Sequence, residues 1–509
     1  MKLAVRNQLV TLGELRRAWL EPVEVSLGND ARRRIAESRE LIEDVVAHGD
    51  QVYGVNTGFG QLASVRVGDS ELAHLQENLV RSHAVGVGED LDDNIVRLVM
   101  LMKVIALAEG FSGVRLELVE KLCDLINNNI YPRIPSRGSV GASGDLAPLA
   151  HMAGALIGIG EVRIDGTLVP AQVALQEAGI EPIRLGPKEG LALLNGTQVS
   201  TALALSAVFR TENVLSAALM AGAMSSDAIK GSDTPFDRRI QNVRGHGGQI
   251  AVAGVLREII QGSDIRASHI GCDRVQDPYS IRCQPQVTGA CLDVLRHVCG
   301  VLETEANAVT DNPLVFTDSG VVLSGGNFHA EPVALAADYL ALAIAEIGAL
   351  SERRIALLID SHLSGLPAFL VEESGLNSGF MMAQVTAAAL ASENKSHAHP
   401  ASVDSIPTSA NQEDHVSMAT FAARRLHSML DNVANIVAIE LLAAAQGIDF
   451  HRPQKSSPAI EEVIAVLREQ SPSYAEDRSL SADIERVAAK IDGGDYCTHA
   501  NSILPSLSK

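Results

Sequence analysis

Long apolar segments with helical spacing dominate the pattern of hydrophobic and polar positions along the chain. The clearest segment covers residues 332–359, where leucines and isoleucines are separated by alanines and charges occur only at Asp338, Glu346 and residues 352–354. It opens with Pro332, and proline is favoured in the first turn of a helix because no backbone hydrogen bond is lost there. A helix that is apolar on most faces has to be surrounded by other helices. The segment therefore predicts a long helix inside a bundle.

Similar alanine- and leucine-rich segments predict further helices over residues 32–48, 94–109, 201–230, 287–308 and 417–446. Alternation of β-branched residues is confined to short pieces such as 161–164 and 321–323. Aromatic residues make up only 3% of the chain, so the core has to be built from small aliphatic side chains that let long helices approach closely. The pattern predicts an all-α fold with minor short strands.

The chain shows no proline- and serine-rich linker, low-complexity tract or repeat that would separate domains. Its longest uncharged run, residues 190–209, is long enough to span a bilayer, but the polar residues 195–198 interrupt it. We interpret this run as a polar loop that leads into a buried helix. We expect an N-terminal domain over residues 1–200, followed over residues 201–509 by a central long-helix bundle and a C-terminal helical region, all intertwined as one unit.

The charge balance limits the classes of partner. The chain has 41 Lys and Arg residues against 62 Asp and Glu residues, which gives a formal net charge of −21 at pH 7. Such a charge repels polyanions and anionic lipid surfaces, so we expect neither a nucleic-acid nor a membrane partner. Charges interrupt the N-terminus before an apolar stretch reaches signal-peptide length, and the six cysteines lie far apart, without the spacing of a metal site or a disulfide framework. Both observations favour the reducing cytoplasm.

A glycine-rich loop at residues 141–145, with the sequence Gly-Ala-Ser-Gly-Asp, is the first candidate for chemistry. Such a loop most often serves to cap a helix, a role that Ser143 or Asp145 could fill. The loop does not fit the nucleophile elbow of hydrolases, because Asp145 stands where that motif has glycine. A third interpretation is that the tripeptide Ala142-Ser143-Gly144 cyclises on itself.

Cyclisation would make an electrophile from the backbone. The amide nitrogen of Gly144 attacks the carbonyl carbon of Ala142, and loss of water there and from the Ser143 side chain gives a methylidene-imidazolone ring. Glycine offers a nitrogen without Cβ crowding, serine carries a hydroxyl that can leave by elimination, and alanine keeps the bend small. The order of the three residues is therefore chemically meaningful.

Further polar loops follow one another in a fixed order. Together with the loop above, these motifs occupy residues 53–60, 82–88, 141–151, 193–198, 275–286, 325–332 and 409–415. With them the chain resembles the family of aromatic amino-acid ammonia-lyases and aminomutases. The resemblance is strong from Tyr53 to Met418 and loose at both ends of the chain, and no position that we regard as catalytic departs from the family pattern. An inactive helical scaffold would have lost some of these polar residues, and none is lost.

The resemblance implies an all-α long-helix bundle of the ammonia-lyase/fumarase-like superfamily, assembled as a homotetramer with active sites shared between subunits. It also implies that Ala142, Ser143 and Gly144 form 4-methylidene-imidazol-5-one (MIO) autocatalytically, with no external cofactor. The implied reaction is the non-oxidative elimination of ammonia from an aromatic amino acid. Helices that are apolar on most faces independently favour an oligomer, because one subunit cannot cover them.

Three residues of these motifs have an ordinary interpretation beside the one that the family implies. Tyr53, in a glycine-rich loop, is by default a turn residue, but a phenol can also act as a general base for the β-proton of the substrate. Arg282 could be a surface charge, yet its guanidinium has the geometry to hold a substrate carboxylate. Asn195 precedes a glycine and is by default a turn residue, whereas the family implies that it holds the substrate carboxylate or orients the carbonyl group of the methylidene-imidazolone ring.

Other residues owe their assignment to the resemblance alone. Gln276, Tyr279 and Phe328 would be ordinary loop residues, and in the family they line the substrate pocket. No metal site is expected, because the pair His397 and His399 has no third ligand spaced with it.

Two polar residues bear on the choice of substrate. His83 and Glu413 could be an ordinary histidine and a helix-start acid, but a buried imidazole substrate needs partners for both ring nitrogens, and each one left unpaired costs about 1–3 kcal/mol. Family members that act on phenylalanine carry apolar residues at the position of His83, whereas some that act on tyrosine keep a histidine there. The glutamate at 413 is therefore the more selective feature.

We expect L-histidine as the substrate and trans-urocanate as the product, which is the first step of histidine degradation. The alternatives are a tyrosine or phenylalanine ammonia-lyase or a 2,3-aminomutase. Tyr53 is the first candidate for the base that removes the β-proton, and Glu413 stays open as the second.

Overall fold

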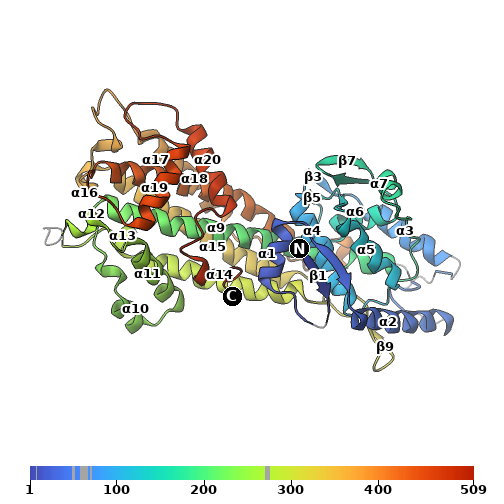
Figure 1. Ribbon diagram of the computed structural model, residues 1–509. Coiled ribbons are helices and arrows are strands. Elements are labelled where there is room, and N and C mark those ends of the chain that lie inside the picture. Colours follow the sequence, from blue (N-terminus) through green and yellow to red (C-terminus); the bar gives the residue numbers. More distant parts are fainter. Residues whose placement is uncertain (7, 49–51, 58–66, 69–70, 270–274, 509) are drawn as a thin grey trace. The chain divides into compact units, whose positions relative to one another are not determined.

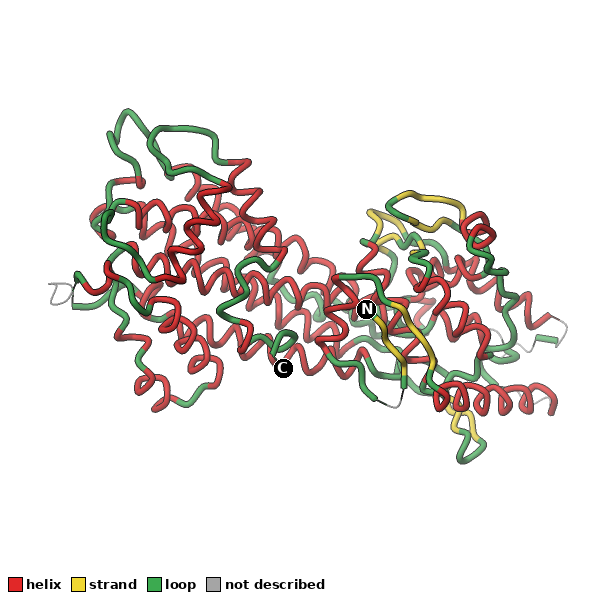
Figure 2. Tube along the Cα trace, in the orientation of Figure 1, coloured by secondary structure: helices red, strands yellow, loops and turns green. Residues whose placement is uncertain are grey.

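The computed structural model describes the chain except residues 7, 49–51, 58–66, 69–70, 270–274 and 509. Helices make up most of the described residues, and the strands are short pieces (Figure 2). The predicted all-α class with minor strands is confirmed.

The predicted elements agree closely with the observed ones. The expected helices correspond to α2 (Asn29–His48), α4 (Asp93–Ala108), α9 (Gln198–Ala228), α14 (Gln284–Ala306), α15 (Glu331–Ile359) and α18 (Ala419–Asp449). The two expected strands are β6 (Glu161–Ile164) and β9 (Val321–Leu323), which match the predicted pieces residue for residue. The apolar pattern is therefore sufficient to locate the long helices.

The chain divides into two compact units, each built from several segments. Unit 1 comprises Met1–Ser206, Cys299–Asp338 and Pro400–Arg424, and unit 2 comprises Ala207–Val298, Tyr339–His399 and Arg425–Lys509. Four of the five boundaries fall inside the long helices α9, α14, α15 and α18, and the fifth lies between residues 399 and 400, outside any helix. The sequence predicts two consecutive domains that meet at residue 200, whereas each compact unit combines three separate segments of the chain. The predicted domains stay a prediction.

Unit 1 combines short helices with small sheets. Its further helices are α1 (Leu12–Leu20), α3 (Leu72–His83), α5 (Leu116–Asn127), α6 (Leu146–Leu156), α7 (Ala171–Glu177), α8 (Glu189–Leu194) and the 3-10 turn η5 (Ser409–Asn411). Its further strands are β1 (Lys2–Val5), β2 (Glu24–Leu27), β3 (Val87–Asp90), β4 (Tyr131–Pro132), β5 (Pro135–Arg137), β7 (Thr167–Pro170) and β8 (Leu314–Phe316). Strands β1 and β2 pair in parallel, while β3-β5, β4-β6-β7 and β8-β9 are antiparallel.

The packing of the helices in unit 1 brings together segments that are far apart in the sequence. Helix α4 is buried from Ile95 to Ala108 and packs against α1, α2 and α5. Helix α6 packs against both α3 and α8. The loop before α6, the last turn of α3 and the end of α8 are therefore neighbours.

Unit 2 contains the remaining helices (Figure 1). They are η3 (Thr234–Phe236), α10 (Arg238–Arg244), α11 (Gly247–Ile260), α12 (Asp264–Ala267), α13 (Tyr279–Arg282), α16 (Ser361–Ser364), η4 (Ala368–Leu370), α17 (Met381–His397), α19 (Pro458–Gln470), α20 (Ser481–Gly493) and η6 (Asn501–Ile503). In its core, Arg354 donates to the two carboxylate oxygens of Glu440 at 2.5 and 2.8 Å. The hydroxyls of Ser225 and Ser351 donate to the same carboxylate at 2.7 and 2.6 Å. These bonds allow two charges to be buried among small aliphatic side chains.

Three helical segments among the described residues are long and apolar enough to cross a membrane, namely Glu189–Ala228, Glu331–Ile359 and Ala419–Asp449. In their most apolar windows, 100%, 67% and 78% of the residues are buried inside the protein. The first segment consists of α8 and α9 with residues 195–197 between them, where the sequence predicts a polar loop.

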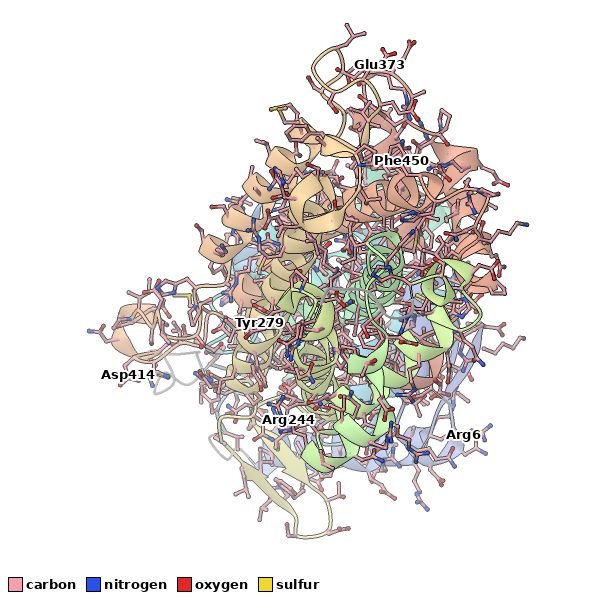
Figure 3. The ribbon with its side chains drawn as sticks, turned by 90° about the vertical axis from the view of Figure 1, so that its left-hand side faces the viewer. Arg6, Arg244, Tyr279, Glu373, Asp414 and Phe450 are labelled. Atoms are coloured by element: carbon pink, nitrogen blue, oxygen red, sulfur yellow. The ribbon has the colours of Figure 1, made fainter. Side chains whose placement is uncertain are left out.

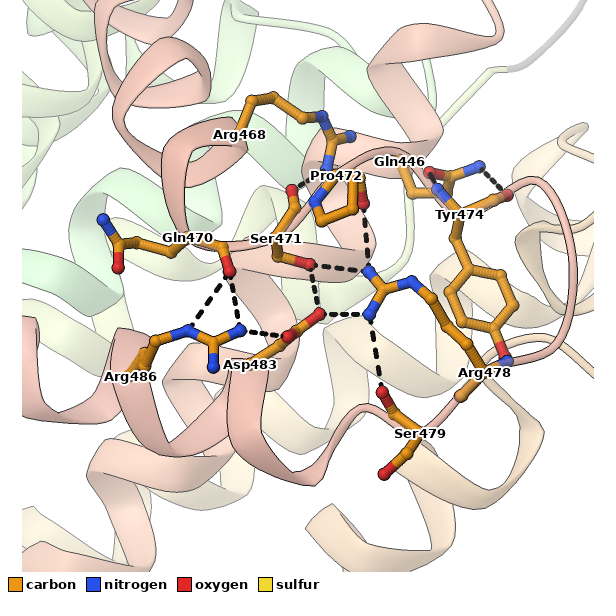
Figure 4. Close-up of polar contacts among 10 residues, drawn as sticks. All are labelled: Gln446, Arg468, Gln470, Ser471, Pro472, Tyr474, Arg478, Ser479, Asp483 and Arg486. Atoms are coloured by element: carbon orange, nitrogen blue, oxygen red, sulfur yellow. Dashed lines mark hydrogen bonds and ion pairs between the residues drawn. The ribbon is translucent and has the colours of Figure 1, made fainter.

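One carboxylate joins the C-terminal helices α19 and α20 (Figure 4). The Ser471 hydroxyl and the Arg478 guanidinium donate to Oδ2 of Asp483 at 2.6 and 2.5 Å, and Arg486 donates to Oδ1. Burial opposes ionisation of Asp483, but these hydrogen bonds and the charges of the two arginines lower its pKa. The carboxylate is therefore ionised at neutral pH.

We expect Asp483→Asn to destabilise the protein by about 1–3 kcal/mol at pH 7, because charge-assisted hydrogen bonds are lost. Since the pKa of Asp483 is lowered by folding, its contribution is present above the pKa of an unfolded aspartate, about 3.9, and disappears as the pH falls through the folded-state pKa. Thermal unfolding of wild type and variant should differ at pH 7 and converge in acid. An equal difference at both pH values would contradict this role.

Candidate active site

A cavity of about 930 Å³ lies in unit 1, at the ends of α3 and α8 and the start of α6. Its wall is formed by residues that are far apart in the sequence. The predicted site residues that line it are Tyr53, His83, Ala142, Ser143, Asn195, Phe328 and Glu413. The structure thus brings six of the seven sequence motifs to one place.

Two glycines shape the loop that carries Ala142 and Ser143. Gly141 and Gly144 have φ angles of 68° and 79°, in the left-handed region that favours glycine. A Cβ on Gly144 would lie 2.5 Å from both the amide nitrogen and the carbonyl oxygen of Gly196, so a larger residue does not fit. The loop is therefore pressed directly against the residue that follows Asn195.

Asp145 does not act as the helix cap that its sequence position suggests. It stands at the N-cap of α6, but its side chain makes no capping bond there. Instead its buried carboxylate accepts from the hydroxyls of Ser139 and Thr420 at 2.8 and 2.7 Å, and from the amide and hydroxyl of Ser200 at 2.7 and 3.0 Å. Asp145 therefore ties the loop to the starts of α9 and α18.

Glu413 contacts the central residue of the tripeptide. The Ser143 hydroxyl donates a hydrogen bond to Oε1 of Glu413, and Thr408 donates to Oε2 at 2.5 Å. The default interpretation places Glu413 at the start of a helix, but no helix begins at this residue. It forms an isolated bridge with Thr408, whose amide donates to the Glu413 carbonyl at 2.9 Å, and residues 409–411 between them have φ angles of 50–68°. The next residue, Asp414, is exposed (Figure 3).

The sequence suggests that His83 lies in a loop, but in the structure it lies in the last turn of α3. Its Nδ1 is 2.9 Å from the Leu79 carbonyl oxygen. Because a carbonyl only accepts, this nitrogen carries the hydrogen, and Nε2 of the neutral ring is an acceptor. Burial lowers the pKa of His83, although the Leu79 bond and the Glu413 charge act in the opposite direction. The ring is therefore neutral near pH 7.

Asn195 is the C-cap of α8 and is 5% exposed. Its side-chain oxygen has no hydrogen-bond partner among the described residues, so it has capacity left for a molecule in the cavity. Its main-chain carbonyl accepts from Lys103 of α4 at 2.5 Å. Lys103 was not predicted from the sequence. A charge that stands alone within the apolar residues 98–108 is the signal that could have revealed it.

Three predicted pocket residues belong to unit 2, whereas the lining of the cavity belongs to unit 1. Gln276 is exposed, and Tyr279, labelled in Figure 3, begins α13 and is 75% exposed. The Arg282 guanidinium lies 5.7 Å from the centre of the Tyr279 ring. Their assignment to the pocket stays a prediction. Residues 58–60 of the first motif and Cys272 lie outside the described residues.

Comparison with known proteins gives a consistent result. Residues 10–469 match the model of the family described as aromatic amino acid lyase. The histidine ammonia-lyase of Vibrio cholerae is 57% identical over 490 residues, which cover 96% of each chain. The crystal structure of histidine ammonia-lyase from Trypanosoma cruzi is similar with a TM-score of 0.91 and 42% identity, over 100% of this chain and 96% of that one. Tyrosine aminomutase from Streptomyces globisporus has a TM-score of 0.93 and 36% identity, over 98% of both chains.

Proposed function

The chain belongs to the aromatic amino acid lyase family, and from this premise we propose that it eliminates ammonia from L-histidine to give trans-urocanate. The observation that carries the proposal is the position of Ser143, His83 and Glu413 on one cavity. A bound substrate would face the electrophile formed at Ser143. It would also face His83 and Glu413, the two partners for an imidazole ring. The name of the Vibrio cholerae relative supports the same choice of substrate.

Residues 142–144 fit the methylidene-imidazolone group. Ala142 and Ser143 line the cavity, and the positive φ angles of Gly141 and Gly144 allow a sharp bend between them. The Gly144 nitrogen has no neighbouring Cβ to hinder its attack. Once formed, the group supplies an electrophilic carbon that makes the substrate amine a better leaving group.

His83 and Glu413 suit an imidazole side chain. Neutral His83 offers Nε2 as an acceptor for the N–H of the substrate ring. Cyclisation removes the Ser143 hydroxyl and so frees Oε1 of Glu413, which then accepts from the other ring nitrogen when that nitrogen is protonated. A phenyl ring would leave both acceptors unpaired, at a cost of about 1–3 kcal/mol each. This difference favours L-histidine over phenylalanine.

Tyr53 is our first candidate for the base that removes the β-proton. It lines the cavity and is half-buried, so its phenol can reach a bound substrate. Oε2 of Glu413 accepts a hydrogen bond from Thr408, which stays in place after the Ser143 hydroxyl has left. Glu413 therefore remains the second candidate for the base.

The substrate carboxylate requires donors. The buried amide of Asn195 on the cavity wall can donate one hydrogen bond, and a guanidinium such as that of Arg282 can donate two in parallel. We propose that Gln276, Tyr279 and Arg282 reach the cavity of another subunit, where Phe328 completes the pocket. Their exposure in one chain supports this sharing of sites.

The proposed assembly is a homotetramer. Leu335, Tyr339 and Leu342 are 55%, 45% and 51% exposed, and their spacing places them on one face of α15. An exposed apolar stripe of this kind indicates a protein–protein interface. Light scattering at micromolar concentration should give four times the mass of one chain. A monomer would contradict the assembly and the sharing of sites.

We also propose that the protein works in the cytoplasm, without a nucleic-acid or membrane partner. The net charge of −21 supports this setting, because it opposes binding to polyanions and anionic lipids. Cys123, Cys283 and Cys291 are free thiols, which suits a reducing compartment.

The test of the proposed activity uses the purified protein without any added cofactor. With L-histidine we expect urocanate absorbance and an equal amount of ammonia. L-Tyrosine and L-phenylalanine should react at least about tenfold more slowly, measured by kcat/KM. Preference for either of them, or formation of a β-amino acid, would contradict the proposal in favour of a tyrosine or phenylalanine ammonia-lyase or an aminomutase.

A further inference from the structure

Lys103 is a charged residue in the middle of an apolar helix. It lies in α4 between Met102 and Val104 and is 1% exposed. Its ammonium donates to the main-chain carbonyl oxygens of Ala192 at 3.2 Å and Asn195 at 2.5 Å. Burial lowers the pKa of Lys103 to about 7, although the charges of Asp311 and Asp145 act in the opposite direction. A buried amine costs free energy, so an apolar residue here would be the more stable choice.

The two carbonyls belong to the end of α8. The last carbonyl groups of a helix lack partners within the helix and need donors from elsewhere. Ala192 lies in the last turn of α8, and Asn195 is its C-cap. By binding both groups, Lys103 fixes the point at which the chain leaves α8 and enters Gly196.

Gly196 in turn lies directly against Gly144. The amide of Asp145 donates to the Gly196 carbonyl at 2.8 Å, and a Cβ on Gly144 would lie 2.5 Å from the Gly196 backbone. A few residues later, Ser200 binds the Asp145 carboxylate. The segment 195–200 therefore holds the bend of residues 142–144 in place.

We propose that Lys103 is a positioning residue for ring formation, which through Asn195 and Gly196 holds the Gly144 nitrogen against the Ala142 carbonyl carbon. The inference rests on the proposed function, since it requires residues 142–144 to cyclise. Lys103 is not among the described residues that line the cavity, so it acts through the backbone and does not touch the substrate.

The step that Lys103 serves releases two water molecules and changes no oxidation state overall. The Gly144 nitrogen bonds to the Ala142 carbon, whose oxygen leaves as water with the amide hydrogens of Gly144 and Ser143. The second water consists of the Ser143 hydroxyl and the Cα hydrogen, and a carbon–carbon double bond remains. An amide nitrogen is a poor nucleophile, so closure depends on holding the reacting atoms together.

Lys103→Met tests the proposal, because it keeps an apolar stem of similar length and removes the donors. We expect a folded protein, with wild-type circular dichroism and oligomeric state. The fraction of the 142–144 peptide that is lighter by two waters, measured by mass spectrometry after purification, should fall by about tenfold or more. The kcat for L-histidine should fall in proportion to this fraction, while KM stays unchanged.

Two further variants make the result decisive. Met100→Leu changes another buried side chain of α4 and should keep full modification. Lys103→Gln keeps a neutral donor on a shorter stem, and it replaces Lys103→Met if that variant does not fold. Its modified fraction should also fall below that of wild type. Full modification in the folded Lys103 variant would overturn the inference alone, whereas an unmodified wild type would overturn the proposed function.

Discussion

Ser143→Ala should lower kcat for L-histidine by about 1,000-fold or more. Alanine carries no hydroxyl that can leave, so the exocyclic methylidene carbon cannot form. The fold should survive, because the substitution removes only one half-buried loop hydroxyl and its hydrogen bond to Glu413. Circular dichroism and thermal unfolding would establish the fold, and release of urocanate and ammonia would measure the activity.

Two variants serve as controls for this prediction. Ser324→Ala removes a different hydroxyl from the cavity wall and should retain nearly wild-type activity. Ser143→Cys should mature in part, because a thiol can also be eliminated. A fully active Ser143→Ala protein would show that the electrophile does not come from residues 142–144.

His83→Leu and Glu413→Ala should each lower kcat/KM for L-histidine by about 100-fold. Each substitution removes one of the two groups that we assign to the nitrogens of the substrate ring. Leucine at position 83 also presents an apolar surface, so any residual activity on L-phenylalanine should decrease less than activity on L-histidine. Parallel kinetics on the two amino acids would separate a change of specificity from a general loss.

His415→Leu is the matched control for the histidine substitution. His415 lines the same cavity, but it is 67% exposed and its ring stacks on His329 with 5.9 Å between the centroids. The preference for L-histidine should therefore survive in this variant. Unchanged histidine turnover in Glu413→Ala would contradict the pocket assignment, even if the lyase chemistry were correct.

The long helices could be predicted because their apolar residues recur with helical spacing over many turns. The predicted segment 332–359 differs from α15 by one residue, and the strand β6 matches its prediction. These elements are determined by local pattern and burial. The loop motifs likewise predict seven residues that line the cavity.

Features that depend on distant partners could not be predicted in this way. The sequence position of Asp145 suggested only a helix cap. Its carboxylate binds residues 139, 200 and 420, and the sequence alone does not show that these residues meet. Glu413 is held by a bridge to Thr408 across a left-handed turn. Lys103 acquires its role from carbonyl groups about 90 positions away in the chain. Only the folded chain brings these groups into contact.

Cyclisation of residues 142–144 can be measured as the mass of the peptide that contains them, taken from wild-type protein that turns over L-histidine. We expect a peptide lighter by two water molecules than its sequence, with the loss located at Ala142-Ser143-Gly144 by fragmentation. The same peptide from Ser143→Ala should lack the loss at the serine side chain. An unmodified peptide from fully active protein would show that the electrophile is not formed from residues 142–144.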